Sequence, residues 1–483
     1  MNTKLERLWR RATTAWTLAA VLTVAGCAVG PNYQRPEPGV PAAWTGASAL
    51  PGATTNASAP SSRPTPSPAS VERWWTAFKD STLDSLVSRA VATNLDLKMA
   101  ESRVRQARAQ WGVQFAGFWP SADAFGQYSR NSAAQSPPAV NLYKAGLDAS
   151  WELDVFGGTR RAVEAADADL AASAEDRRDV LVTLLSEVAL DYINLRGLQR
   201  QLVIAKENLT AQEHSTDLAR RLFAGGFNSK LDVANAEAQV ATTRSQIPSL
   251  ESAIRQTIYS LSVLLAREPS ALLEELSPEA PIPVTPPEVP VGLPSDLLRR
   301  RPDIRRAEAQ LHGATARIGV AAADWFPKFS LTGTLGTSGD KSASLVKWDN
   351  RFYSVGPSVT WSIFDAGRIR SNIQAQNALE EQALLAYQKT VLTALNDVES
   401  ALVAYVKEQQ RRLALAEAVA ANQQAVTLAT QLYTQGQTDY LNVLSSQRAL
   451  YATQDSMAQS ERAVATDLVA VYKALGGGWE SDR

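Results

Sequence analysis

The chain has 483 residues, enough for two or three ordinary domains, and its 48 basic residues nearly balance its 49 acidic ones. This balance gives no electrostatic argument for a nucleic-acid partner. Two histidines and a single cysteine leave no internal disulfide and almost no material for a metal site. We therefore expect no nucleic acid, no bound metal and no cofactor.

The first 26 residues predict a signal peptide. Basic residues such as Arg7 precede an apolar run from Trp16 to Ala25, which is too short to span a bilayer as a helix. The sequence Val-Ala-Gly-Cys, ending at Cys27, resembles a bacterial lipoprotein signal, and the resemblance implies cleavage before Cys27 and acylation of this cysteine. Several acyl chains together anchor a protein durably. The alternative is an ordinary signal peptide with an unrelated cysteine.

Two proline-rich stretches divide the rest of the chain. Residues 27–70 are rich in Pro, Ala, Ser and Thr and predict an extended segment that buries little and lies on a surface. A second cluster of prolines, between residues 278 and 294, predicts a spacer that joins the two halves of the chain. The expected organisation is a signal peptide (1–26), a lipid-anchored segment (27–70), a first repeat (71–290), a second repeat (291–478) and a tail (479–483).

The two halves repeat the same landmarks. The pattern that begins at Asn94 and ends at Trp119-Pro120 returns between Pro302 and Phe326-Pro327, at a constant offset of 207 residues. A second pattern, from Leu218 to Val233, returns 210 residues later. A period near 200 residues is too long for a solenoid, so it predicts a duplicated half.

Each half predicts a helix, two strands, a very long helix, a turn and a returning helix. Residues 368–435 contain no Gly or Pro, and these 68 residues would form a helix roughly 100 Å long. The counterpart, residues 159–224, is interrupted by Gly197 alone. The returning helices are expected to start near Lys230 and Tyr440, giving long helical hairpins over about 159–267 and 367–475.

The turns of these hairpins lie at 225–230 and 436–440. Gly226 and Gly436 are expected at the position after a helix end that favours positive φ. Asn228 or Ser229 in the first turn, and Thr438 or Asp439 in the second, are candidates to cap the next helix.

The strands, expected at about 121–131, 141–151, 328–337 and 352–363, alternate apolar and polar residues, the first run less cleanly than the others. Such alternation is typical of a strand between lipid and a watery lumen. The aromatic pairs Tyr143 with Trp151 and Tyr353 with Trp361 are each eight residues apart, about 26 Å, close to the roughly 25 Å apolar band of an outer-membrane barrel. The alternative is a soluble sandwich with one buried face.

Four strands cannot close a membrane barrel, since single-chain examples begin at about eight. Open strand edges cannot face lipid either, because each unpaired backbone group there costs several kcal/mol. The strand count therefore predicts that further copies of the chain complete the sheet.

Motifs along most of the chain resemble one family, the outer-membrane factors of tripartite efflux pumps, in the lipoprotein OprM/NodT branch of the TolC-like proteins. The motifs lie at Cys27–Tyr33, Trp74–Leu83, Asn94–Asp96, Trp151–Gly157, Gly292–Leu298, Arg301–Glu308 and Tyr472–Trp479. The resemblance implies an α+β membrane protein, a homotrimer with a 12-stranded β-barrel of four strands per chain above a periplasmic helical tunnel. It also implies the outer membrane of a Gram-negative bacterium, a periplasmic adaptor protein and an inner-membrane RND-type transporter as partners.

The expected function is passive conduction of small molecules, such as drugs, from these partners to the exterior. We find no catalytic motif, and His214 and His312 are isolated in the sequence, which favours surface or packing roles and no enzymatic activity. Two alternatives stay open: a duct for protein or polysaccharide export, and a lipid-anchored helical scaffold without a pore.

The tip of the hairpins is the expected gate. The family that the motifs resemble carries aspartates and a hydrogen-bonding lock at its closed end, and the resemblance implies Asp439 as the first candidate and Asp232 as the second. A ring of three carboxylates would favour cations and bind divalent ions. Asp439 is also a candidate N-cap, and the two roles are compatible; relatives often carry the acid one position earlier, where this chain has Thr438. Candidates for a lock between neighbouring helices, within about two turns of the tip, are Asp217, Arg220, Arg221 and Tyr433. Solvated helix faces are the alternative for each of these.

Overall fold

The computed structural model describes residues 28–45, 63–65, 71–133, 136–286 and 288–479. The chain divides into two compact units. The first joins Arg103–Ala174 and Arg306–Gln388 with the N-terminal residues up to Glu37, and the second joins Pro38–Ser102, Glu175–Arg305 and Lys389–Arg483. Each unit therefore draws on both repeats. The predicted signal peptide and the lipid anchor at Cys27 lie outside the described residues.

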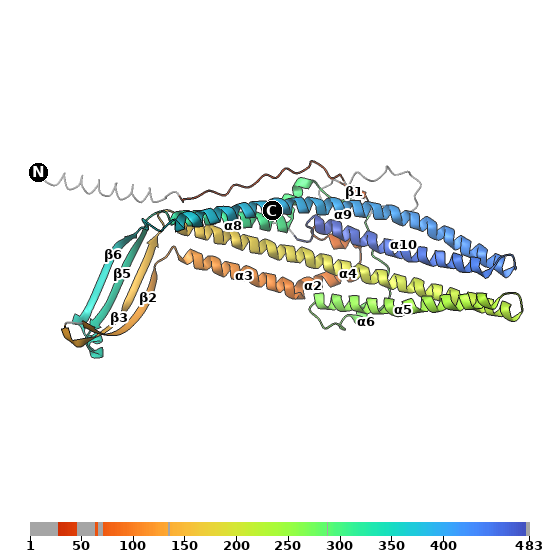
Figure 1. Ribbon diagram of the computed structural model, residues 1–483, viewed down its shortest axis with the longest axis horizontal. Coiled ribbons are helices and arrows are strands. Elements are labelled where there is room, and N and C mark those ends of the chain that lie inside the picture. The colour runs from red at the N-terminus through yellow and green to blue at the C-terminus, as the bar shows by residue number, and fades with distance from the viewer. Residues whose placement is uncertain (1–27, 46–62, 66–70, 134–135, 287, 480–483) are drawn as a thin grey trace. The chain divides into compact units, whose positions relative to one another are not determined.

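The first unit holds a four-stranded antiparallel sheet (Figure 1). Its strands are β2 (Ser121–Ala133), β3 (Ser136–Leu153), β5 (Lys328–Gly339) and β6 (Arg351–Thr360). The order β2-β3-β5-β6 joins the two repeats at the β3–β5 pair, where Leu147 lies opposite Leu335. The sequence predicts that the fourth strand reaches about residue 363, but the strand ends at Thr360. The next side chain, that of Trp361, donates its indole N–H to the carbonyl of Trp325 at 3.1 Å.

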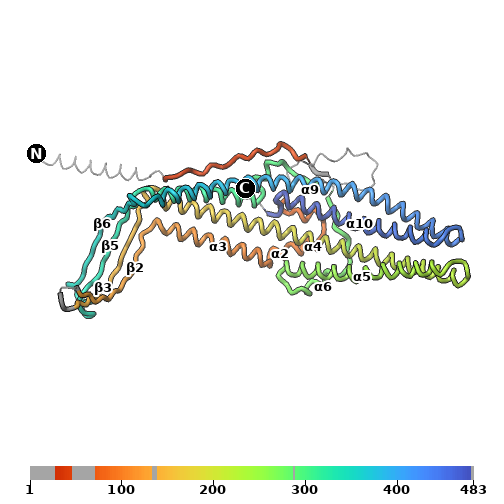
Figure 2. Tube along the Cα trace, in the orientation of Figure 1, coloured from red at the N-terminus to blue at the C-terminus, as the bar shows by residue number. Residues whose placement is uncertain are grey.

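The predicted helices form in both repeats, as the trace in Figure 2 shows. They are α2 (Ser81–Thr93), α3 (Leu95–Ala116), α4 (Gly158–Ala224), α5 (Lys230–Leu264), α8 (Pro302–Ala323), α9 (Arg368–Thr434) and α10 (Tyr440–Ala474), with one-turn helices α6 (Leu273–Leu276) and α7 (Leu297–Arg300). Helices α4 and α9 have 67 residues each, and the returning helices α5 and α10 have 35 each. In the described part of the chain, no helix is both long enough and apolar enough to cross a membrane.

Both long helices begin with the same device. The carboxylate of Asp154 accepts the backbone N–H groups of Thr159 at 3.0 Å and Arg160 at 2.9 Å. In the second repeat the carboxylate of Asp365 accepts the backbone N–H of Ile369 at 2.9 Å. These bonds satisfy amide groups that have no partner within the first turn of a helix, so the duplicated aspartates define where α4 and α9 start.

Helix α4 continues through Gly197 without a break. A close contact with α10 explains why a glycine is needed at this position. A Cβ atom at this position would lie 2.5 Å from Cδ of Arg462. The glycine therefore lets the α10 side chain cross the surface of α4 in the second unit.

The N-terminal segment is held more firmly than expected. In the second unit the side chain of Trp44 is 5% exposed, and its indole donates to the carbonyl of Gly292 at 3.2 Å. The expectation that this segment buries little is therefore wrong at Trp44. In the first unit Tyr33 stacks on His312 with ring centroids 4.5 Å apart, and Nε2 of His312 lies 3.0 Å from a carboxylate oxygen of Glu164. His312 is thus a packing residue with partners rather than an isolated one.

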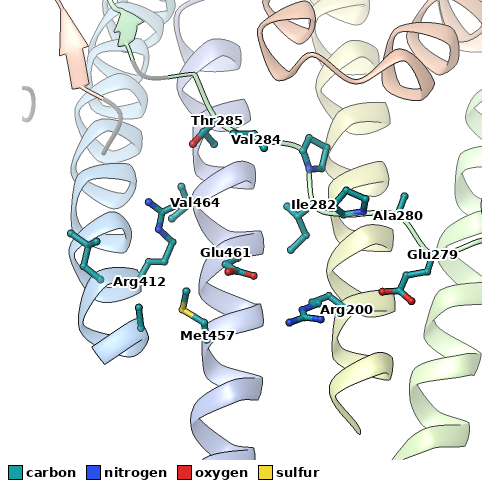
Figure 3. Close-up of a pocket in the computed structure, with 14 residues that line it drawn as sticks. Arg200, Glu279, Ala280, Ile282, Val284, Thr285, Arg412, Met457, Glu461 and Val464 are labelled. Atoms are coloured by element: carbon teal, nitrogen blue, oxygen red, sulfur yellow. The ribbon is translucent and has the colours of Figure 1, made fainter. Parts of the chain in front are cut away.

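A short parallel pair also belongs to the second unit: β1 (Arg63–Thr65) lies beside β4 (Glu288–Pro290). The chain between the repeats, predicted as a plain spacer, forms part of this pair. It also covers a cavity of about 660 Å³, which residues 279–285 line together with α4, α9 and α10 (Figure 3). Side chains of both charges, those of Arg200, Arg412 and Glu461, line this cavity.

Candidate functional site

The sheet has one apolar face and one polar face. Directly paired residues point to the same side, so the register defines both faces. The apolar face carries Ala124, Tyr128, Tyr143, Leu147, Trp151, Leu331, Leu335, Tyr353, Val355 and Val359. The polar face carries Asp123, Gln127, Lys144, Asp148, Ser150, Thr332, Thr334, Ser354 and Ser358. The alternation expected from the sequence is confirmed for most positions of the four strands, with exceptions such as Phe125 and Phe352, which lie on the polar face.

The apolar face is open in the single chain. Tyr353 is 82% exposed and Val355 is 74% exposed, while Leu147 and Leu335, opposite each other at the centre, are both more than half exposed. A contiguous apolar surface of this kind marks contact with lipid or with another protein. The outer sides of β2 and β6 are unpaired within the described residues, so the sheet also has two free edges.

The four predicted interface aromatics lie on or next to this face. Tyr143 and Trp151 belong to β3, Tyr353 belongs to β6, and Trp361 follows the end of β6. The indole of Trp151 donates to the carbonyl of Phe118 at 2.9 Å, which repeats the contact that Trp361 makes in the second half. Each indole is thereby fastened to the backbone just before a strand. The role of these aromatics at a membrane surface stays a prediction.

Two glycines face each other on the polar face where the two repeats meet. Gly146 of β3 lies opposite Gly336 of β5 on this face. A Cβ at Gly146 would lie 2.5 Å from the carbonyl oxygen of Leu335, and one at Gly336 would lie 2.7 Å from that of Ala145. The backbones approach too closely here for any side chain, and glycines at such points let a sheet bend. The two repeats therefore pair most closely at this pair of glycines.

The hairpin turns in the second unit have the geometry that the sequence predicted. Gly226 and Gly436 have φ angles of 78° and 70°. The backbone N–H of Phe227 reaches back to the carbonyl of Leu222 at 2.9 Å, the bond that closes a helix through a left-handed residue.

The two predicted gate carboxylates differ in their surroundings. Asp232 forms a capping box with Ser229, whose backbone N–H donates to the Asp232 carboxylate at 3.2 Å. Asp439 occupies the N-cap position of α10, but its side chain makes no capping bond. Its carboxylate is exposed and has no hydrogen-bond or ion-pair partner among the residues that the structure describes. Its role in a gate stays a prediction.

One hydrogen-bonded contact joins the two hairpins at their tips. The side-chain amide of Asn228, in the first turn, donates to the hydroxyl of Tyr433 at 2.9 Å and to the carbonyl of Ala219 at 3.0 Å. We call these three groups the tip lock. Tyr433 is 6% exposed and packs beside Tyr440, and burial, with the neighbouring Tyr433 and Asp232, raises the pKa of Tyr440 to about 12. The sequence predicts Tyr433 as a lock residue, whereas it offers Asn228 only as a candidate helix cap.

The other predicted lock residues pair within their own hairpin. Arg220 donates to Glu237 across the first hairpin at 2.8 Å, and Arg221 lies 3.4 Å from Asp217 one turn away on α4. The side chains of the second pair are 71% and 61% exposed. Exposed pairs of this kind contribute little to stability. Of the four predicted lock residues, Tyr433 of the second hairpin is thus the one that contacts the turn of the other hairpin, through Asn228.

The described residues contain no cluster of three or more His, Cys, Asp or Glu side chains with metal-binding geometry. What they contain is a two-faced sheet with open edges and a pair of duplicated long hairpins. These features define a class, the channel proteins of the outer membrane.

The chain belongs to the outer membrane efflux protein family, which it matches over residues 86–267 and 293–477, one stretch in each half. It is 37% identical over 430 residues to the pyoverdine export outer membrane protein OpmQ of Pseudomonas aeruginosa, covering 86% of this chain and 89% of that protein. It is 31% identical to the toluene efflux pump outer membrane protein TtgF of Pseudomonas putida, covering 96% and 97%. The solved structure of the outer-membrane channel OprN superposes with a TM-score of 0.86 at 33% identity, covering 94% of this chain and all of that chain. The protein is an efflux channel component of the outer membrane.

Proposed function

We propose that three copies of the chain close their sheets into one 12-stranded barrel, which serves as the exit duct of a tripartite efflux system. The observation that carries this proposal is the sheet itself, with an exposed apolar face, a polar opposite face and two free edges. Pairing β2 of one copy with β6 of the next would satisfy the free edges and turn every apolar face toward lipid. The polar faces would then line a watery lumen.

The long hairpins would continue the duct through the periplasm. Helices of 67 residues are roughly 100 Å long at about 1.5 Å per residue, enough for a tunnel reaching far below the membrane. Their tips are the natural docking surface for a periplasmic adaptor and, through it, an inner-membrane RND-type transporter that supplies energy and direction. The duct itself conducts passively.

The tip lock would hold the tunnel closed at its periplasmic end. It ties the first turn to α9 through Asn228 and Tyr433, so separating the hairpins breaks a partly buried hydrogen bond in each chain. The free carboxylate of Asp439 at the neighbouring turn would form a ring of three in the trimer and favour cations there.

The cargo we propose is small organic molecules. OpmQ is described as a pyoverdine exporter and TtgF as part of a toluene efflux pump, which supports small molecules over proteins or polysaccharides. Acylation at Cys27 would anchor the N-terminal segment in the outer membrane.

Single-channel recording on the purified protein tests the proposal. We expect a trimer by light scattering, a heat-sensitive mobility in detergent gels, and defined conductance steps in planar bilayers from the wild type or from the Asn228→Ala variant. A monomer without conductance in either form would overturn the duct and favour the helical scaffold.

A further inference from the structure

Two phenyl rings break the polar character of the polar face. Phe125 of β2 lies opposite Gly146, Gly146 lies opposite Gly336, and Gly336 lies opposite Phe352 of β6. This phenyl–glycine row crosses all four strands. It places an aromatic side chain at each end of a row whose neighbours on the same face are Ser, Thr, Asp, Gln and Lys.

The rings lie over the glycines. The Cβ position of Gly146 is 3.0 Å from Cε1 of Phe125, and that of Gly336 is 2.9 Å from Cζ of Phe352. Each ring occupies the space that a side chain on the next strand would have filled. Both rings are half-buried, so part of each aromatic surface stays accessible from the polar side of the sheet.

The next row on this face carries negative charge. Asp123 lies directly opposite Asp148, two residues along from Phe125 and Gly146, and Asp148 accepts a hydrogen bond from the hydroxyl of Thr334 at 2.6 Å. Like charges directly opposite each other destabilise a sheet. Lys144 lies on the other side of the row, also two residues from Gly146. The acidic pair and the phenyl ring of Phe125 are therefore neighbours on the same surface.

We propose that Phe125 and Phe352 determine specificity within the lumen, where their accessible faces bind the aromatic or apolar part of organic cations in transit. An aromatic face attracts a cation within about 6 Å of its centroid, and Trp, Tyr and Phe all provide this contact. The acidic pair favours the same charge. This inference rests on the proposed duct, because the polar face is a lumen only in a closed barrel. Three chains would supply six phenyl rings.

A purely structural role for the rings gives a different expectation. Aromatic side chains also cover glycines in sheets and stabilise them there. Leucine would still cover Gly146 and Gly336 but has no aromatic face. The double variant Phe125→Leu/Phe352→Leu therefore separates recognition of cargo from support of the sheet.

The test measures block of single-channel current by tetraphenylphosphonium, an aromatic cation, and by tetrabutylammonium, which has the same charge and no ring. Current is recorded from the wild-type trimer or, if the tip is closed, with all proteins in the Asn228→Ala background. In the double leucine variant we expect the half-blocking concentration of tetraphenylphosphonium to rise about fivefold, as for loss of one exposed cation–π contact, with that of tetrabutylammonium unchanged. Asp148→Asn should weaken block by both cations.

Tyr353→Leu is the matched control, because it removes an aromatic one residue from Phe352 on the opposite face. It should leave block by both cations unchanged. Equal block in the wild type and the double leucine variant, with normal conductance and a heat-sensitive trimer, would overturn the inference and leave the duct intact. Absence of any conductance in the wild type and in Asn228→Ala would overturn both.

Discussion

The tip lock makes a quantitative prediction about channel opening. Asn228→Ala removes the donor to the Tyr433 hydroxyl, at 2.9 Å, and leaves that hydroxyl without this partner in a side chain that is 6% exposed. A hydrogen bond contributes about 1 kcal/mol net, and a buried group that loses its partner costs about 1–3 kcal/mol. With about 1 kcal/mol lost in each of three chains, the closed tip would be destabilised by about 3 kcal/mol, or about 100-fold in the ratio of open to closed channels.

The assay is the open probability of single channels formed by wild type, Asn228→Ala, Tyr433→Phe and the double variant. Both single variants should open more often than the wild type. Because the two side chains share one hydrogen bond, the double variant should open little more than the stronger single variant, so the double-mutant cycle should show coupling.

Asn442→Ala provides the control at the same tip. The side-chain amide of Asn442 donates to the hydroxyl of Thr438 at 2.6 Å, a local bond within the second hairpin. It should leave the open probability near the wild-type value. The reasoning would be refuted if this control opened the channel as much as Asn228→Ala, or if the effects of Asn228→Ala and Tyr433→Phe were simply additive.

Three further outcomes follow from the structure. Gly146→Ala should abolish the heat-sensitive trimer, because the new Cβ would lie 2.5 Å from a backbone oxygen, whereas Gly356→Ala in the same sheet meets nothing within 4 Å and should assemble normally. Cys27→Ala should lose incorporation of radiolabelled palmitate while the wild type retains it; labelling of the variant would contradict the anchor. Burial, with repulsion from Glu408, raises the pKa of Asp467 to about 6. The folded protein then holds the proton of the Asp467 carboxyl group more tightly than the unfolded chain does. Protonation of Asp467 therefore adds to the free energy of unfolding fully below about pH 4, and this contribution is lost as the pH rises through about 6. Asp467→Asn should therefore raise the unfolding temperature near pH 7. In this variant the unfolding temperature should also rise less than in the wild type when the pH falls from about 7 to about 5, and an unchanged pH profile would refute the raised pKa of Asp467.

Much of the fold was predictable because it depends on local patterns. Period-two alternation identified the four strands, and a long stretch without Gly or Pro identified α9 almost to the residue, since helix and strand preferences act along neighbouring residues. The end of the fourth strand was missed because Trp361 continues the alternation in sequence but uses its side chain to bind a backbone carbonyl. The burial of Trp44 was missed because the segment around it has the composition of a surface segment. Its hydrogen-bond partner, Gly292, lies 248 residues further along the chain.

The contacts that build the candidate sites join residues far apart in the chain. Asn228 and Tyr433 are 205 residues apart, and a turn residue that caps helices elsewhere gives no local sign of such a partner. The sequence by itself determined the duplication, the two-faced strands and the need for further copies, because these follow from periodicity and from counting strands. The tertiary structure alone decided which strands pair, that two glycines meet on the polar face, and that phenyl rings cover them. Alternation within a strand excludes register shifts by one residue, but which strand pairs with which, and at which even shift, is a relation between distant segments.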